Sequence, residues 1–390
     1  MEWWVKSGKE SSVRIAFVST YPPIECGIGT YTSFLIEALA KLPNEIHIIS
    51  QNGAEGRHVY PSYSPREDGI AAKIFNAIIK VTPDVVHIQH EFGLYGELDG
   101  IAVLELIYRL KSTGTPVIAT FHTVRKDFEF RKELILRTMC RELDGIIVHK
   151  QEHVDILRTV FDTDQSKIFL IPHGARDMDP IPDAKKKLDL EGRKVILLAG
   201  YFRPTKCFDR IVELFPQIVK KVPDAWLVLS GKLRMLEFSI YRKMLFEKIN
   251  NSPVRDRIEV FRGQFPQQTF DTILSAADIV VLPYSAGGQS GIMAHAMTFG
   301  KPVVTSNLPA FVDTIEKSET GFYAQTDDEY VDRIVTLLTD PEVYKKFSQN
   351  ALTYIKENIS WDIVARQTLN VYEEFGLKLE CKTRYVFAGE

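Results

Sequence analysis

The chain has 390 residues and a formal net charge of −3, with 45% hydrophobic and 25% charged residues. This balance is typical of a folded globular protein and excludes a disordered or fibrous chain, and the length predicts two domains. The slight negative charge gives no overall attraction for nucleic acid, which is not expected as a partner.

The cysteines and the amino-terminal segment indicate in which cellular compartment the protein is found. The four cysteines are scattered and form no CxxC pair, which argues against a disulfide framework and a zinc site. The sequence has no apolar run of about 18 residues and no signal-peptide core, so we expect a cytoplasmic protein. Trp3 and Trp4 near Lys6 and Lys9 leave two alternatives, a disordered or packed leader and a peripheral contact with the inner membrane face.

The first half of the chain alternates short β-branched runs with segments of helical spacing, which is typical of parallel α/β structure. Strands are predicted over 13–19, 45–50, 84–89, 116–121, 145–149 and 167–171. Helices are predicted between them over 29–41, 67–81, 99–113, 129–142 and 151–161. Each strand is apolar nearly throughout, as expected when both faces of a sheet are covered.

Residues 171–194 are rich in proline and charge, show no periodicity and are predicted to connect two domains. The alternation then restarts. The predicted strands are 194–200, 225–231, 257–261, 278–283 and 301–306, and the predicted helices are near 207–221, 235–250, 267–276, 289–299, 327–338 and 341–358. We therefore predict two Rossmann-like, doubly wound domains, over 1–180 and 181–359.

Parallel sheets of this type bind ligands beyond the carboxyl ends of their strands, so two facing domains are expected to share an interdomain cleft. Functional residues should lie in the loops that follow strands. The first such loop carries Gly27 and Gly29 just before a helix, where backbone N–H groups can approach an anion. The GxG spacing lacks the third glycine of a dinucleotide-binding motif, so a plain turn is an equal alternative.

Polar residues also follow two buried strands of the first domain. His122 stands at the carboxyl end of strand 116–121, where it either faces the cleft or has a structural role. His90 and Glu91 stand at the exit of strand 84–89. These two residues either bind an acceptor or cap the following helix.

In the second domain, Arg203 and Lys206 follow the first strand directly. Two cations at such an exit can bind a diphosphate, and a solvated loop is the alternative. Further along, glycines stand at the start of the helix predicted over 289–299, whose first N–H groups can hold phosphate oxygens. These glycines are Gly287, Gly288 and Gly291, and a glycine-rich connector is their alternative role.

Two acid pairs, DTD at 162–164 and DMD at 177–179, superficially resemble the metal-binding DxD of other sugar transferases. Each lies in a hydrophilic turn, where aspartates cap helices or fill linkers. We therefore expect no metal site.

Four segments together resemble family 4 of the retaining glycosyltransferases, which have the GT-B fold. They are STYPPIECGIGTYT (19–32), FHT (121–123), GYFRPTK (200–206) and GGQSGIMAHAMTFGKPVV (287–304). Residues 360–375 are similar to the helix that crosses back to the first domain in these enzymes. The resemblance thus covers nearly the whole chain, and it implies that a segment of about 360–390 completes the acceptor-side domain 1–180, while 181–359 binds the donor.

The resemblance also implies roles for single residues. Gly27 and Gly29 fall where the first loop of the family meets the donor diphosphate, and His122 falls where a histidine meets the sugar. Arg203 and Lys206 fall in the diphosphate clamp. Lys206 matches the family in register, whereas the usual arginine directly follows the glycine, where this chain has a tyrosine, so Arg203 is taken as its substitute.

The chain departs from the family at two glutamates, whose positions are occupied by Gly287 and His295. In relatives the first glutamate faces the reacting sugar and the second holds the nucleotide ribose, so their loss bears on donor identity and on activity. A branch of the family has a QSG turn in place of the acidic loop, which implies that Gln289 and Ser290 meet the donor. His295 either bonds the ribose or has no special role.

We therefore expect a hexosyltransferase that transfers from a nucleotide-diphosphate sugar to a hydroxyl of a glycan, lipid-linked or small-molecule acceptor, with retention and without a metal or other cofactor. The expected catalytic residues are His122, Arg203 and Lys206; the donor-binding residues are Gly27, Gly29, Gly288, Gln289, Ser290, Gly291 and His295; the acceptor-binding residues are His90 and Glu91. Two alternatives remain, a nucleotide-sugar epimerase or phosphorylase on the same fold and a non-catalytic subunit that binds sugar nucleotides.

Overall fold

The computed structural model describes residues 13–231, 239–263, 265–286 and 291–375. The chain forms two compact units. Unit 1 consists of Met1–Gly174 and Trp361–Glu390, and unit 2 consists of Ala175–Ser360. Unit 1 is therefore discontinuous in sequence, because the last helix of the chain belongs to it.

Unit 1 contains a seven-stranded parallel sheet in the order β3-β2-β1-β4-β5-β6-β7. Its strands are β1 (Val13–Val18), β2 (Asn44–Gln51), β3 (Val59–Tyr63), β4 (Val85–His90), β5 (Val117–Phe121), β6 (Gly145–Val148) and β7 (Ile168–Leu170). Its helices are α1 (Gly27–Leu39), α2 (Ile70–Val81), α3 (Glu97–Gly100), α4 (Ala102–Lys111), α5 (Phe130–Glu142), α6 (Gln151–Thr159) and α15 (Trp361–Phe375).

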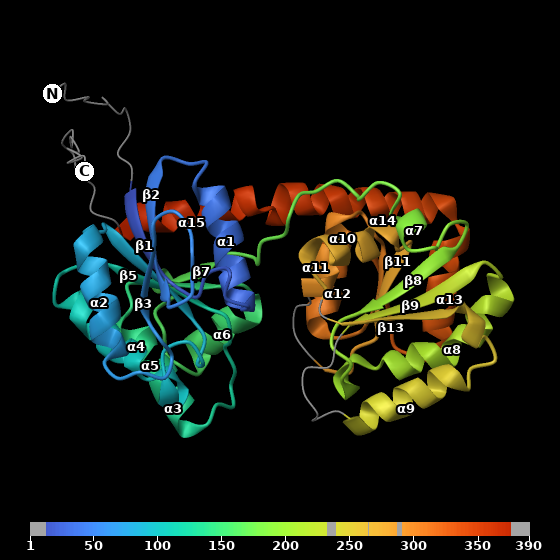
Figure 1. The fold of residues 1–390 in the computed structure, drawn as a ribbon, viewed down its shortest axis with the longest axis horizontal. Coiled ribbons are helices and arrows are strands. Elements are labelled where there is room, and N and C mark those ends of the chain that lie inside the picture. Colours follow the sequence, from blue (N-terminus) through green and yellow to red (C-terminus); the bar gives the residue numbers. More distant parts are fainter. Residues whose placement is uncertain (1–12, 232–238, 264, 287–290, 376–390) are drawn as a thin grey trace. The chain divides into compact units, whose positions relative to one another are not determined.

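Helices cover both faces of this sheet (Figure 1). On one face, α2, α4, α5 and α6 enclose a core that contains Ile74, Leu106 and Leu136. On the other face, α1 and α15 pack against each other over a second core, which contains Leu35 and Tyr372. Burial on both faces explains why the strands are apolar nearly throughout.

Helix α15 is fixed to unit 1 at its first residue. The indole ring of Trp361 lies so close to Gly174 that a Cβ atom on this glycine would overlap the ring. The same indole contacts Tyr31 of α1, with ring centroids 5.0 Å apart. The side chain at the start of α15 therefore closes the second core of unit 1.

Unit 2 contains a six-stranded parallel sheet in the order β10-β9-β8-β11-β12-β13. Its strands are β8 (Lys194–Ala199), β9 (Ala225–Gly231), β10 (Ile258–Arg262), β11 (Ile279–Leu282), β12 (Val303–Ser306) and β13 (Gly321–Ala324). Its helices are α7 (Ala184–Lys187), α8 (Phe208–Lys221), α9 (Ser239–Asn250), α10 (Gln267–Ala276), α11 (Gly291–Thr298), α12 (Pro309–Ser318), α13 (Asp327–Thr339) and α14 (Pro341–Tyr354).

The strand order reverses once in each sheet, between β1 and β4 in unit 1 and between β8 and β11 in unit 2. Connections leave the two central strands toward opposite sides at such a point, so the loops beyond their carboxyl ends diverge and leave room for a ligand. Two doubly wound units confirm the predicted fold class. A ligand site is therefore expected at the carboxyl ends of β1 and β4 in unit 1 and of β8 and β11 in unit 2.

Four elements were not predicted from the sequence: the strands β3 and β13 and the helices α7 and α12. Helix α7 lies within residues 171–194, which were predicted to connect the domains without regular structure. Strands β3 and β13 lie at sheet edges, where each pairs with one neighbour only. The sequence VYPSY of β3 is interrupted by Pro61, and β13 has only four residues. The hydrophobic signal of an edge strand is weak because one side of the strand remains uncovered.

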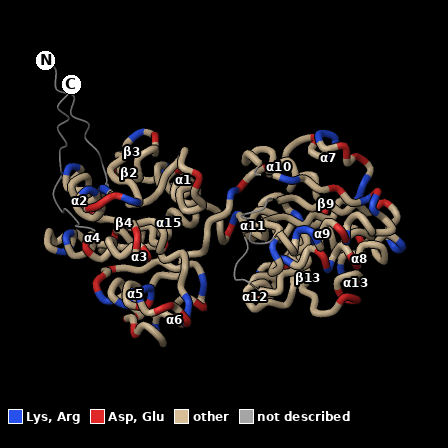
Figure 2. Tube along the Cα trace, turned by 60° about the horizontal axis from the view of Figure 1, so that its bottom comes forward, with Lys and Arg blue, Asp and Glu red and all other residues tan. Residues whose placement is uncertain are grey.

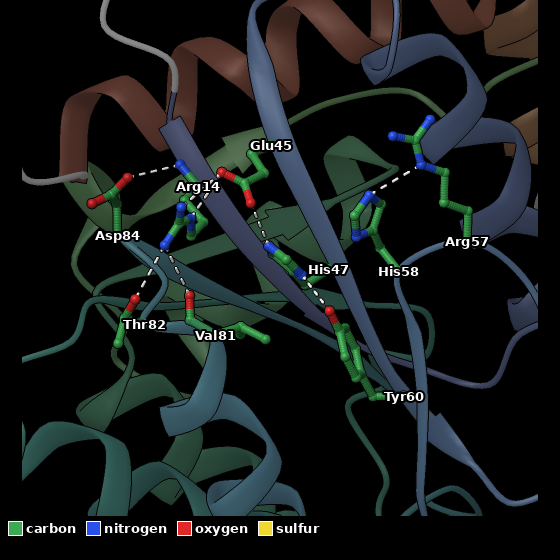
Figure 3. Close-up of polar contacts among 9 residues, drawn as sticks. All are labelled: Arg14, Glu45, His47, Arg57, His58, Tyr60, Val81, Thr82 and Asp84. Carbon is green, nitrogen blue, oxygen red and sulfur yellow. Dashed lines mark hydrogen bonds and ion pairs between the residues drawn. The ribbon is translucent and has the colours of Figure 1, made fainter. Parts of the chain in front are cut away.

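Charged residues of unit 1 are paired at the amino ends of its central strands (Figure 3). Nε of Arg14 donates to Glu45 at 2.9 Å, and the backbone N–H of Arg14 donates to the Asp84 carboxylate at 2.7 Å. The second oxygen of Glu45 lies 2.9 Å from Nε2 of His47, whose Nδ1 lies 3.1 Å from the Tyr60 hydroxyl. These contacts tie β1, β2, β3 and β4 together at that end of the sheet.

Acidic and basic residues alternate along the outer helices of both units (Figure 2). Some form exposed ion pairs, such as Lys221 with Asp332. Within the described part of the chain, every helix is too short or too polar to cross a membrane. The leader that carries Trp3 and Trp4 lies outside the described residues.

Candidate functional site

The loop after β1 leads into an uncapped helix start. Cys26 precedes α1 without a side-chain hydrogen bond to its first turn, which also contains no acidic residue. A Cβ atom on Gly29 would lie 3.3 Å from the carbonyl group of Thr20, so a glycine allows α1 to pack closely against this loop. At Gly27, which is exposed, no described atom lies within 4 Å of such a Cβ. The helix start thus has no side-chain cap and no acidic residue in its first turn, and such N-termini can hold an anion.

His122 follows β5 directly and lies half-buried at the carboxyl end of the sheet. Its Nε2 lies 2.8 Å from Oε1 of Gln89, and its backbone N–H donates to the carbonyl of His90. The edge of its ring meets Tyr31 of α1, with centroids 5.0 Å apart. Contacts from β4 and α1 thus fix the orientation of this imidazole.

Several histidines gather around His122 at the exits of β4, β6 and β7. Burial, together with the nearby His149, His173, His90 and His87, holds the pKa of His122 well below its usual range. Burial disfavours the charged imidazolium, and the neighbouring rings add repulsion. His122 is therefore neutral at physiological pH and can both donate and accept a hydrogen bond.

The two predicted acceptor residues differ in their surroundings. His90 is 1% exposed, neither of its ring nitrogens has a hydrogen-bond partner in the described structure, and burial lowers its pKa to about 3. Glu91 is half-buried, and its carboxylate accepts hydrogen bonds from the Thr123 hydroxyl at 2.6 Å and from the backbone N–H of Phe92 at 3.1 Å. Glu91 thereby links the exit of β4 to that of β5.

In unit 2, the loop after β8 passes close to the end of β9. A Cβ atom on Gly231 would overlap the carbonyl oxygen of Gly200, so only glycine fits at position 231. Phe202 is buried against Phe208, with ring centroids 6.0 Å apart. This anchor holds the loop in place while Arg203 and Lys206 follow within it.

Lys206 and Arg203 are half-buried cations at the exit of β8. Nζ of Lys206 lies 3.3 Å from the centroid of the Tyr284 ring, a cation–π contact across the reversal point between β8 and β11. The backbone N–H of Ser285 donates to the Thr205 carbonyl at 3.1 Å and joins the two loops.

No described carboxylate neutralises the charges of this pair. In the described structure, neither Lys206 nor Arg203 has an ion-pair partner, and Nε of Arg203 is buried without a hydrogen bond. Burial and the charge of Arg203 lower the pKa of Lys206 to about 8. Two cations without a carboxylate at the exit of a parallel strand are a suitable site for a polyanion.

The glycine-rich segment before α11 is described only in part. Gly291 begins α11 and is exposed, with no described atom within 4 Å of a Cβ placed on it. The ring of His295, in the same helix, meets Phe270 edge-on at 5.9 Å. Gly287 and three predicted donor-binding residues, Gly288, Gln289 and Ser290, lie outside the described residues.

Sequence reasoning missed four residues at these strand ends: Gln89, Tyr31, His149 and Tyr284. Gln89 and His149 carry the same signal as His122, since each is a polar residue at the carboxyl end of a buried strand. Tyr31 and Tyr284 give no such signal, because an aromatic residue beside a core is ordinarily part of that core.

Neither predicted acid pair takes part in a cluster with metal-ligand character. Asp164 accepts a hydrogen bond from the backbone N–H of Ser166 and caps a short turn, as expected for a solvated aspartate. Across the described ranges, no group of three or more histidine, cysteine, aspartate or glutamate residues could hold a metal ion.

Two family models match consecutive parts of the chain. The model of Glycosyltransferase Family 4 matches residues 26–177, and the model of glycosyl transferases group 1 matches residues 180–353. A phosphatidyl-myo-inositol mannosyltransferase of Mycolicibacterium smegmatis is 24% identical over 278 residues, which cover 68% of this chain and 66% of that protein. An uncharacterized glycosyltransferase of Methanocaldococcus jannaschii is 26% identical over 227 residues, 55% of this chain and 56% of that protein.

Solved structures share the architecture. A glycosyltransferase of Rickettsia africae superimposes with a TM-score of 0.72 at 18% identity, covering 95% of this chain and all of that one (100%). Anabaena HepE, solved in complex with UDP and glucose, gives a TM-score of 0.69 at 14% identity and covers 93% of this chain and 100% of its own. Likeness at this identity shows the fold, which is the predicted GT-B arrangement of two doubly wound units.

Proposed function

The chain belongs to the group 1, family 4 glycosyltransferases, and from that premise we propose that it transfers a hexose from a nucleotide-diphosphate sugar to a hydroxyl acceptor with retention of configuration. The observation that carries the proposal is the pair Arg203 and Lys206, two cations without a described carboxylate partner at the reversal point of the unit 2 sheet. A diphosphate supplies the negative charge that this pair lacks.

The chemistry follows from the charge that develops during transfer. Departure of the nucleoside diphosphate leaves an oxocarbenium-like sugar and concentrates negative charge on the leaving phosphate. Arg203 and Lys206 stabilise this charge most when it is greatest, so they lower the barrier rather than only binding the donor. The leaving phosphate then accepts the proton of the acceptor hydroxyl, and the protein needs no nucleophile.

In unit 1, the neutral imidazole of His122 is the group best suited to meet a sugar hydroxyl. Burial, together with the neighbouring His149 and His173, keeps its pKa low, so it binds without carrying a charge of its own. The uncapped start of α1 at Gly27 supplies N–H donors for the donor diphosphate. These roles agree with those that the family resemblance implies.

For the acceptor we propose a carbohydrate or lipid-linked hydroxyl, as in the phosphatidyl-myo-inositol mannosyltransferases among the relatives. For the donor we propose a nucleoside-diphosphate hexose, supported by the UDP and glucose bound in Anabaena HepE.

The proposal is tested by screening nucleotide sugars for thermal stabilisation of the protein and by measuring nucleoside diphosphate affinity by calorimetry. We expect Lys206→Ala to weaken the diphosphate affinity by about 1.5–3 kcal/mol, or about 10–150-fold. Lys194→Ala is the matched control. Lys194 lies at the opposite end of β8, paired with Asp224 at 3.3 Å, and its loss should leave the affinity unchanged.

Equal affinity of the Lys206→Ala and Lys194→Ala variants would contradict the assignment of the diphosphate site. Analysis of the products separates the remaining alternatives. A new sugar nucleotide formed from donor alone identifies an epimerase, and a sugar phosphate formed with inorganic phosphate identifies a phosphorylase. Tight donor binding without any turnover identifies a binding subunit, as the replacement of a family glutamate by His295 would allow.

A further inference from the structure

Gln89 is a fully buried polar residue in the strand that leads to the candidate site. It is the second-last residue of β4 and is 0% exposed. Its backbone carbonyl accepts a hydrogen bond from the Tyr95 hydroxyl at 2.7 Å, which fixes the main chain at this point. A buried amide must satisfy its own polar atoms within the protein, so the partners of this side chain are structurally determined.

One of these partners determines where a proton resides on His122. Oε1 of Gln89 is a carbonyl oxygen and can only accept, and it lies 2.8 Å from Nε2 of His122. With the amide in this orientation, Nε2 of His122 carries the hydrogen. A neutral imidazole has a single N–H, so Nδ1 retains its lone pair and is the acceptor. Nδ1 makes no hydrogen bond within the described residues.

The opposite end of the amide holds Gln89 in this orientation. Nε2 of Gln89 lies 3.4 Å from Nε2 of His87, which lies 2.8 Å from the Thr120 hydroxyl. Nδ1 of His87 bonds the hydroxyl of Tyr372, in helix α15. With Nδ1–H of His87 donating to Tyr372, the lone pair of its Nε2 accepts from both Thr120 and Gln89. Rotation of the amide would instead place two acceptors, Oε1 of Gln89 and Nε2 of His87, against each other.

Among the described residues, the groups that face His122 most closely besides Gln89 are aromatic rings. They are the rings of Tyr31, His149, His173, His90 and His87, and none of them is a carboxylate. A neutral histidine in water divides its proton between the two nitrogens, so a fixed acceptor on one side is what selects a single form. Gln89 is that acceptor.

We infer that Gln89 is a positioning residue that holds the His122 proton on Nε2 and so presents Nδ1 as the hydrogen-bond acceptor for a sugar hydroxyl. The inference rests on the proposed function, which places His122 against the sugar. The inference specifies that Nδ1 of His122 makes the contact with the sugar and that Gln89 determines this choice of nitrogen. The hydrogen-bonded chain from Tyr372 through His87 and Gln89 ends at Nε2 of His122.

The test uses the full chain with ¹⁵N-labelled histidine and reads the tautomer from long-range ¹H–¹⁵N spectra. The signal of His122 is assigned by its disappearance in His122→Ala. In the unsubstituted protein we expect His122 in the Nε2–H form. Gln89→Leu should shift it toward a mixture of both forms.

Gln51→Leu is the matched control, because Gln51 is a buried glutamine at the end of β2 in the same sheet and its amide donates to the Leu94 carbonyl at 3.2 Å. It should leave the spectrum of His122 unchanged. Turnover should fall about tenfold in Gln89→Leu but not in Gln51→Leu, with nucleoside diphosphate affinity unchanged in both.

An Nδ1–H form in the unsubstituted protein would overturn the inference, and this measurement requires no variant to fold. An unchanged tautomer in folded Gln89→Leu would overturn it as well, even if the protein transfers sugar, and would leave the proposed function intact. A shifted tautomer with unchanged turnover would contradict the role toward the sugar. Failure of the proposed function itself appears differently, as no turnover of any donor by a protein whose His122 has the expected tautomer.

Discussion

The two ends of the unit 1 sheet use similar residue types in opposite ways. At the amino end, the charges of Arg14, Glu45 and Asp84 satisfy one another, and His47 is bonded through both ring nitrogens (Figure 3). At the carboxyl end, His90 has no hydrogen-bond partner in the described structure, and Nδ1 of His122 makes no bond there either. A polar group whose bonds are complete supports the fold, whereas an incomplete one is available to a ligand.

Unit 2 repeats this contrast. At its amino end, the Asp278 carboxylate accepts from the backbone N–H of Val195 at 2.6 Å and from Lys185 at 2.7 Å. At its carboxyl end, Lys206 and Arg203 stand without a described ionic partner. The same division in two separate sheets indicates that strand exits, rather than charged residues in general, mark the functional side of each unit.

His122→Ala should produce the largest effect on chemistry. We expect turnover to fall about 10–150-fold with little change in donor affinity, because the lost contact matters most in the transition state. Steady-state kinetics with calorimetry of donor binding measures both quantities. His47→Ala is the control at the amino end and should lower stability while turnover per folded molecule is unchanged. Equal loss of turnover in the two variants would contradict the prediction that the carboxyl end of the sheet serves catalysis and the amino end serves stability.

Asp84→Ala should affect stability rather than activity. Its carboxylate accepts the backbone N–H of Arg14, and loss of a hydrogen bond to a charged group costs about 1–3 kcal/mol. Urea denaturation measures the free energy of unfolding, with Asp68→Ala, at an exposed position between β3 and α2, as the control. A loss of donor affinity in folded Asp84→Ala would show that the amino end takes part in binding.

The pH dependence of nucleoside diphosphate affinity should report on Lys206. Burial and Arg203 lower the pKa of this lysine to about 8, and the ammonium is the form that attracts a diphosphate. Affinity should therefore be constant just below pH 8 and fall above it, by up to about tenfold per pH unit, because binding then requires uptake of a proton. Lys206→Arg should abolish this decline, since arginine stays charged. A flat profile in the unsubstituted protein, measured by calorimetry between about pH 7 and 9.5, would contradict the prediction.

Much of the fold could be predicted from sequence because a strand covered on both faces must be apolar, and the central strands of both sheets are. The elements that were not predicted lie where the chain is not required to be apolar throughout. Strands β3 and β13 are edges, and α12 begins at Pro309, which breaks the pattern that precedes it. Helix α4 was predicted from residue 99 but begins at Ala102, because Leu98 and Asp99 have positive φ angles of 55° and 60°.

The candidate site could be predicted in part by one rule, that polar residues after buried strands face the ligand side of a parallel sheet. The rule predicts His122, Arg203 and Lys206 from the sequence alone. It could not find Tyr284, since the stacking of an ammonium on a ring depends on which strand exits are neighbours in space. Nor could it show that Gln89 determines the proton position of His122, because this follows from a distance between residues 33 positions apart.

The late position of α15 in the chain has a consequence for synthesis. Unit 1 begins first at the ribosome, but its second core and the Tyr372 hydroxyl that bonds His87 are supplied by residues after 360. Unit 2, although it follows, is complete as soon as Ser360 has been translated. During synthesis, the second core of unit 1 therefore stays uncovered until α15 follows unit 2 out of the ribosome.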